Sequence, residues 1–151
     1  KPGSRAISPP AAAASPPPQA RAAMAAAAAE VEPAAKAAED VLKGLEAPLV
    51  IDARDPEEVV GQKGGPALPD SVNVPFNIDG QKQTERPTTA EEYVAKLEAA
   101  GCLPADKSAA IITHCGSGGR GGRSATVIAG MGYTNVHNGG SPDNIRAARG
   151  S

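Results

Sequence analysis

Cys115 lies in a segment that combines a nucleophilic side chain with a glycine-rich loop. The segment reads His114-Cys-Gly-Ser-Gly-Gly-Arg-Gly-Gly-Arg-Ser-Ala125, after a β-type apolar run over residues 109–113 and before a helical pattern that starts near Arg120. In the order strand, loop, helix, the cysteine faces a helix N-terminus, where unpaired N–H groups and the positive end of the helix dipole favour a thiolate over a thiol. The segment therefore predicts nucleophilic chemistry at sulfur.

The residues around Cys115 are expected to form the rest of the site. Glycine accepts backbone angles that other residues avoid, so a glycine-rich loop can turn its amides toward an anion. We predict that Arg120 acts with Cys115, either orienting an anionic donor or holding the loop, because a cation at a helix N-terminus opposes the dipole and needs a reason to be there. Arg123 is expected to be an auxiliary cation. The other predicted substrate-binding residues of the loop are Gly116, Ser117, Gly118, Gly119 and Gly121.

The spacing of this loop resembles the active-site loop of the rhodanese family, in which four residues separate the catalytic Cys from an Arg. Cys115 and Arg120 have that spacing, and Ser117 and Gly118 match the family's common Cys-x-Ser-Gly-x-Arg form. The resemblance spans residues 36–148. It implies a single rhodanese-like domain with Cys115 as the catalytic nucleophile.

Segments on both sides of the loop extend the resemblance. Residues 49–58 resemble the family's other signature, a buried strand that ends in Asp-x-Arg with a Glu four residues beyond the Arg. Residues 132–140 resemble the strand and the Gly-Gly turn that follow the loop helix. Residues 64–71 depart from the family, because they replace its usual Gly-His-Ile-Pro-Gly-Ala turn. Three charged residues of the upstream signature are expected to support the site structurally, with an Arg54–Glu58 pair across a helix start: Asp52, Arg54 and Glu58.

The resemblance implies a sulfurtransferase. The Cys115 thiolate takes the outer sulfur of a donor such as thiosulfate, sulfite leaves, and the resulting persulfide passes its sulfur to cyanide or a thiol. A sulfur-carrying protein fits the role of acceptor as well as a small thiol does. The reaction needs no cofactor, and the sequence contains no spacing typical of a metal site.

Two other functions are compatible with the same loop. Dual-specificity phosphatases and arsenate reductases are similar, but they have five residues between Cys and Arg, and Gly121 stands at that position here. Their His-Cys pair is nevertheless matched by His114-Cys115, and Arg123 lies further along the loop. Rhodanese-like domains also occur as inactive interaction modules in larger assemblies, although such a module has no need for the Cys and its glycine loop. We therefore expect sulfur transfer ahead of both alternatives.

Apolar spacing predicts helices that alternate with strands after residue 34. This alternation is typical of an α/β fold with a mainly parallel central sheet flanked by helices on both faces, which is the rhodanese-like architecture. In such sheets the ligand site lies beyond the carboxyl ends of the strands, where Cys115 falls. The predicted helices are 34–45, 56–60, 89–100, 120–131 and a short one after Pro142, and the predicted strands are 48–53, 71–74, 109–114 and 136–138.

Residues 1–33 are predicted to be a disordered extension that precedes a domain over residues 34–151. The extension consists mainly of Ala, Pro and Ser, which cannot bury enough apolar surface to offset the entropy of ordering. It contains Arg5 and Arg21 and no acidic residue before Glu30, a bias typical of organellar transit peptides. We expect an organellar protein, with chloroplast favoured over mitochondrion; a linker or anchor in a cytoplasmic protein is the alternative.

Charge and hydropathy exclude other functions. The formal net charge is −2, which provides no basic surface for nucleic acid. No apolar run is long enough to cross a bilayer.

Cys102, at a helix exit, is expected to be a buried thiol and not a redox partner. His114 is expected to pack or to donate a supporting hydrogen bond, not to act as general base, and the polar segment 76–88 is expected to be a lid or a docking surface.

Overall fold

The structure, a computed structural model, describes residues 31–150, and its centre is a parallel sheet. The strands are β1 (Leu49–Asp52), β2 (Val72–Asn73), β3 (Ile111–His114) and β4 (Val136–Asn138), in the order β2-β1-β3-β4 with every pair parallel. The predicted α/β fold is confirmed. Of the extension predicted for residues 1–33, residues 1–30 lie outside the described residues.

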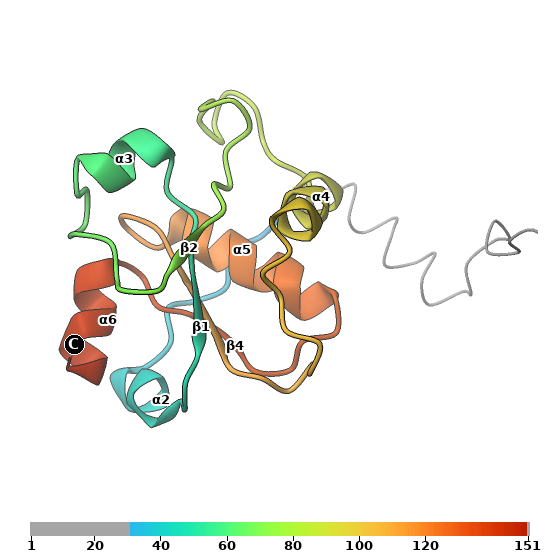
Figure 1. The fold of residues 1–151 in the computed structure, drawn as a ribbon. Helices are drawn as coiled ribbons and strands as arrows, with labels where there is room; N and C mark the ends of the chain where they lie inside the picture. Colours follow the sequence, from blue (N-terminus) through green and yellow to red (C-terminus); the bar gives the residue numbers. More distant parts are fainter. Residues whose placement is uncertain (1–30, 151) are drawn as a thin grey trace, which may run out of the picture.

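Helices cover both faces of this sheet (Figure 1). Helices α2 (Glu39–Gly44) and α6 (Pro142–Arg149) contact each other on one face, and α4 (Ala90–Ala100) and α5 (Gly119–Gly130) contact each other on the other. The short helix α3 (Pro56–Val60) follows β1. Because all strands are parallel, the β1–α3 and β3–α5 loops meet at the same edge of the sheet.

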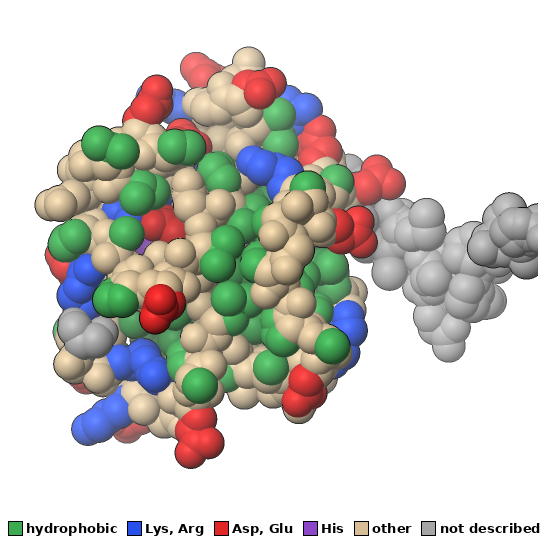
Figure 2. Space-filling model, in the orientation of Figure 1, with side chains coloured by type: hydrophobic (Ala, Val, Ile, Leu, Met, Phe, Trp, Pro, Cys, Tyr) green, Lys and Arg blue, Asp and Glu red, His purple; other side chains and the backbone are tan. Residues whose placement is uncertain are grey.

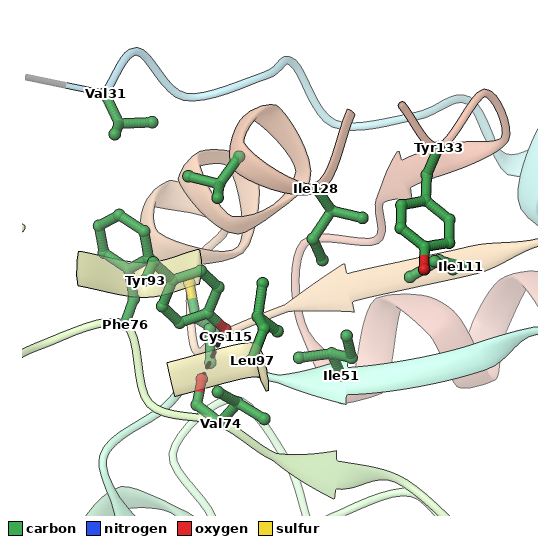
Figure 3. Packing of buried hydrophobic residues seen from close by; sticks show 12 residues of the cluster. Val31, Ile51, Val74, Phe76, Tyr93, Leu97, Ile111, Cys115, Ile128 and Tyr133 are labelled. Atoms are coloured by element: carbon green, nitrogen blue, oxygen red, sulfur yellow. Dashed lines mark hydrogen bonds between the residues drawn. The ribbon is translucent and has the colours of Figure 1, made fainter. Parts of the chain in front are cut away.

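Each face of the sheet has its own apolar cluster. Ile111 lies in the cluster beneath α4 and α5, whereas its neighbour Ile112 lies in the cluster beneath α2 and α6, because successive residues of a strand point to opposite faces. The first cluster contains Phe76, Tyr93 and Tyr133, and the ring centroids of Phe76 and Tyr93 are 4.8 Å apart (Figure 3). Cys115 belongs to this same cluster.

The helix predicted over residues 34–45 is shorter in the structure, where it covers only Glu39–Gly44. Residues 34–37 are extended because their backbone pairs elsewhere: Ala34 N–H donates to the Gly122 carbonyl, and Ala37 N–H donates to the Asn138 carbonyl. Tertiary backbone pairing here overrides the helix propensity of alanine. Within α2, Leu42 is fully buried and Val41 is 42% exposed, so Leu42 faces the sheet.

We call residues 31–36 the N-terminal arm. It runs over α5, and its Val31 side chain points toward that helix in Figure 3 and is only 6% exposed. Lys36 forms a parallel bridge with Asn138 beside β4. Residues 31–33, which the composition places in the disordered extension, therefore pack against the domain.

The remaining predicted elements differ only at their ends. Strands predicted over residues 48–53, 71–74 and 109–114 are shorter, at Leu49–Asp52, Val72–Asn73 and Ile111–His114. Helix α4 begins with a capping box, which the Thr89-x-x-Glu92 spacing encodes: Thr89 Oγ1 accepts from Glu92 N–H, and the Glu92 carboxylate accepts from Thr89 N–H. Among the helices of the described residues, none is long and apolar enough to cross a membrane.

Candidate active site

Cys115 lies directly beyond the carboxyl end of β3. Its backbone N–H donates to the Gly140 carbonyl over 3.1 Å, and its thiol sulfur accepts a hydrogen bond from Gly118 N–H over 2.9 Å. The residue is 1% exposed and packs in the apolar cluster that contains Phe76 and Tyr93. The loop thus aims at least one backbone amide at the sulfur, as the strand, loop and helix order predicts.

The loop approaches β3 so closely that glycine is required. Gly118 is the N-cap of α5 and has φ 109°, a left-handed backbone conformation that residues with side chains rarely adopt. A Cβ on Gly121 would lie 2.7 Å from the Cα of His114, so the first turn of α5 rests directly on the strand end. Thr113 Oγ1 fastens the same turn by donating to the Gly121 carbonyl over 2.6 Å.

Arg120 forms a two-point ion pair with Glu58, which joins α5 to α3. Its Nη1 and Nη2 atoms donate to Glu58 Oε1 and Oε2 over 2.5 and 3.1 Å. The hydrogen bond from Arg120 lowers the pKa of Glu58 to about 2, although burial opposes the shift, and the Asp55 N–H and Lys63 contribute to the lowering. Arg120 is therefore held in place and its charge is largely neutralised.

Arg54 pairs with Asp52, and the predicted Arg54–Glu58 pair is wrong. Arg54 Nε and Nη2 donate to the Asp52 carboxylate over 2.9 and 2.6 Å, and both side chains are almost completely buried. Arg54 Nη1 also donates to the carbonyls of Lys63 and Gly65. The pair thus supports the 63–65 turn, in the region where the sequence departs from the rhodanese pattern.

His114 lies on the opposite face of the sheet from Cys115, because adjacent strand positions alternate. It is fully buried, and within the described part of the chain neither ring nitrogen has a hydrogen-bond partner. Burial lowers the pKa of His114, which the nearby Asp52 carboxylate opposes; Nδ1 lies 3.9 Å from Asp52 Oδ1. This position favours packing over a role as general base for Cys115.

An open pocket of about 460 Å³ adjoins the loop. Among the predicted site residues, Ser117, Gly119, Arg120, Arg123 and Glu58 line it, whereas the buried Cys115 does not. Sequence reasoning missed the lining residues Asp55, Lys63, Asn77, Gly80, Lys82, Gln83 and Thr84.

Five of the missed lining residues come from the 76–88 segment, whose polar composition is the signal that could have found them. Hydrogen bonds within the segment and from α4 hold it in place. Gln83 Nε2 donates to Asn77 Oδ1 over 2.7 Å, Thr88 Oγ1 donates to the Phe76 carbonyl over 2.8 Å, and Lys96 Nζ donates to the Asn77 carbonyl over 3.0 Å. The segment therefore forms one wall of the pocket.

Gly116, which was predicted to bind substrate, is not among the residues that line the pocket. It lies against Lys63, whose Cγ would be 3.3 Å from a Cβ at that position. Cys102 and Cys115 are both free thiols, and burial raises the pKa of Cys102. Within residues 31–150, no group of three or more His, Cys, Asp or Glu side chains could hold a metal ion.

Fold and site together define an α/β domain with a buried cysteine in the loop between the strand β3 and the helix α5. The model of the rhodanese-like domain family matches residues 37–140, more than half of the chain, and the chain belongs to that family.

Two solved structures resemble the fold. A rhodanese with anions from E. coli is 23% identical, covers 65% of this chain and 91% of its own, and has a TM-score of 0.43. A 3-mercaptopyruvate sulfurtransferase from Leishmania major is 17% identical, covers 61% of this chain and 27% of its own, and has a TM-score of 0.42. A search of curated proteins found no match.

Proposed function

We propose that the protein is a sulfurtransferase that carries sulfane sulfur on Cys115. The observation that carries the proposal is the contact between Gly118 N–H and the Cys115 sulfur, at 2.9 Å, in a loop next to a pocket with four cationic side chains. An N–H aimed at sulfur favours negative charge there, both on the thiolate and on the persulfide that replaces it. Family membership supports the same chemistry.

In the first half-reaction the Cys115 thiolate attacks the outer sulfur of thiosulfate. The new bond joins the two sulfur atoms, the sulfur–sulfur bond of thiosulfate breaks, and its electron pair leaves with sulfite. Because Cys115 is 1% exposed, residues 116–118 must move for the donor's sulfur to reach Sγ. Gly116 and Gly118 in this short loop allow that movement.

In the second half-reaction an acceptor attacks the outer persulfide sulfur. With cyanide, a carbon–sulfur bond forms, thiocyanate leaves, and the electron pair of the broken sulfur–sulfur bond restores the thiolate. A thiol acceptor gives its own persulfide in the same way. Arg120 holds the loop through Glu58, while Ser117, Gly119 and Arg123 line the path of the donor.

The test is the intact mass of the reduced protein after incubation with thiosulfate. We expect a gain of one sulfur atom that cyanide removes with release of thiocyanate. Cys115→Ser must abolish the gain. Cys102→Ser is the matched control, because it removes the other thiol, and we expect it to keep the gain.

Other outcomes would redirect the assignment. No gain of mass in the wild-type protein would contradict sulfur transfer, and hydrolysis of a phosphate ester or reduction of arsenate would then favour the phosphatase-like alternative. Absence of all three activities would favour a non-catalytic interaction module.

Basic side chains (blue) and acidic side chains (red) are interspersed on the face that Figure 2 shows. This mixture supports small-molecule or protein partners over nucleic acid.

An organellar location, with chloroplast ahead of mitochondrion, is part of the proposal. Its support is the Arg-containing segment without acidic residues before Glu30. A fluorescent fusion to residues 1–33 should accumulate in plastids; a diffuse cytoplasmic signal would contradict this location.

A further inference from the structure

The N-terminal arm contacts the helix that carries the pocket's arginines. The Val31 carbonyl accepts from Arg123 Nε over 3.1 Å, and the Glu32 carbonyl accepts from Thr126 Oγ1 over 2.6 Å. Ala34 fits so closely that a Cβ on Gly122 would lie 2.5 Å from its carbonyl oxygen. The arm is therefore fastened along the first half of α5.

The arm is also linked to the cap of the cysteine loop. Asn138 Nδ2 donates both to the Ala34 carbonyl, over 2.9 Å, and to the Gly118 carbonyl, over 3.1 Å. Gly118 is the residue whose N–H contacts the Cys115 sulfur. One amide group thus ties the arm to the loop that surrounds the nucleophile.

The cations of the pocket are not equivalent. Arg120 donates both terminal nitrogens to Glu58, and Lys63 Nζ lies 3.2 Å from the same carboxylate. Among the described residues, by contrast, no carboxylate pairs with Arg123 or Lys82. Arg123 Nε is bound to the Val31 carbonyl, while Nη1 lies beside Gly119, 3.6 Å from where a Cβ would stand.

We propose that Arg123, held by the N-terminal arm, is the group that binds the negative charge of the sulfur donor in this pocket. Fixing Nε on a carbonyl leaves the two terminal nitrogens of a guanidinium free to donate to an anion. Because a carbonyl carries no charge, this contact orients Arg123 without neutralising it. Arg120, which Glu58 neutralises, then keeps α3 and α5 together. The inference rests on the proposed function for the identity of the anion.

The arm is therefore part of the site, although it lies outside the residues that match the family model, which begin at position 37. The arm acts on the donor through Arg123, so its residues are positioning residues. Arg123 and Lys82 face the pocket from α5 and from the 76–88 wall. A compact dianion between them is the ligand that these positions favour.

Binding can be tested without sulfur transfer in the Cys115→Ser protein. Amide NMR shifts of residues 116–120 are followed during a thiosulfate titration, which measures dissociation constants into the millimolar range. We expect saturable shifts, and Arg123→Gln should raise the dissociation constant about tenfold. Lys43→Gln, which removes an equal charge from an exposed site on α2, should leave it unchanged.

The role of the arm needs its own variant. Thr126→Val removes the hydrogen bond to the Glu32 carbonyl with little change of shape, and it should raise the dissociation constant about threefold. Combined with Arg123→Gln, it should have no additional effect, because the arm acts through Arg123. Thr134→Val, at an exposed threonine before β4, is the matched control and should change nothing. Arg123→Lys keeps the positive charge, so it should bind thiosulfate more tightly than Arg123→Gln does.

Distinct results would overturn the proposal. The absence of saturable shifts in the Cys115→Ser protein would show that the pocket does not bind the donor anion. Unchanged affinity in Arg123→Gln would assign the charge to another residue, and an additive effect of Thr126→Val would remove the arm from the mechanism. Sulfur transfer by the wild-type protein can succeed or fail independently of each result, so the two proposals are separable.

Discussion

The Arg120 guanidinium and the Glu58 carboxylate form a two-point ion pair between residues 62 positions apart. Their side chains are 15% and 20% exposed, so water weakens the interaction only partly. Glu58 lies in α3, which follows β1, and Arg120 lies in the first turn of α5, which follows β3; these strands are neighbours in the sheet. The pair fixes the distance between the two helix starts that border the pocket.

Glu58→Gln should destabilise the protein by about 1–2 kcal/mol at pH 7, because a charge-assisted pair becomes a neutral hydrogen bond. Urea unfolding measures this difference. The control is Glu57→Gln, an exposed neighbour on α3, which we expect to change stability by less than about 0.5 kcal/mol. Equal effects of the two variants would show that the ion pair is energetically unimportant.

The stabilisation from Glu58 should depend on pH. Its pKa is lowered from the ordinary 4.5 to about 2 in the folded protein, so the charged form is the one that the fold stabilises. The difference between wild type and Glu58→Gln is therefore complete above about pH 4.5 and lost as the pH falls through about 2. A difference that stays constant down to pH 2 would contradict the pairing with Arg120.

Gly121→Ala should cost about 1–3 kcal/mol, because its Cβ would meet the His114 backbone, which cannot move without shifting β3. We also expect slower sulfur transfer, since the same strand end carries Cys115. The control is Gly130→Ala in the same helix, where a Cβ meets nothing within 4 Å. Gly130→Ala should be neutral or stabilise by up to about 1 kcal/mol. Thermal unfolding of both variants makes the comparison.

His114 should make the protein less stable in mild acid. Burial lowers its pKa below the ordinary 6.5, against Asp52 and together with Arg54 and Arg146, so the unfolded chain takes up a proton that the folded chain does not. Stability is therefore complete above about pH 6.5 and falls as the pH drops toward the lowered value. Urea midpoints between pH 7.5 and 5.5 should fall less steeply in His114→Leu than in wild type. Parallel slopes would assign the acid sensitivity to other groups.

The sequence was sufficient for the features that depend on local pattern. The order of strands and helices, the Thr89 capping box and the cysteine loop follow from periodicity, capping residues and glycine spacing. The partner of Glu58 could not be predicted in this way. Arg54, four residues away, was the local candidate, but Arg54 turns to Asp52 and to two carbonyls, and the true partner is 62 residues distant.

The arm shows the same limit of local reasoning. Its alanines favour a helix in isolation, and its proline suggests a linker. Instead the backbone of residues 34–37 pairs with the carbonyls of Gly122 in α5 and Asn138 in β4, the edge strand of the sheet. The pocket wall at residues 77–84 is likewise built from polar side chains that follow no period, so only their position next to the loop gives them a role.

The alternation along β3 makes the orientation of the Cys115 sulfur a consequence of correct pairing between strands. His114 and Cys115 are adjacent, and only the register Asp52↔His114 directs the sulfur toward the loop amides and the imidazole away from them. A slip of one residue would exchange the two side chains between the faces of the sheet. Molecules that fold with such an error would keep their sheet but present an imidazole where the Cys115 thiol belongs, so the rate at which a reagent labels Cys115 would report the fidelity of folding.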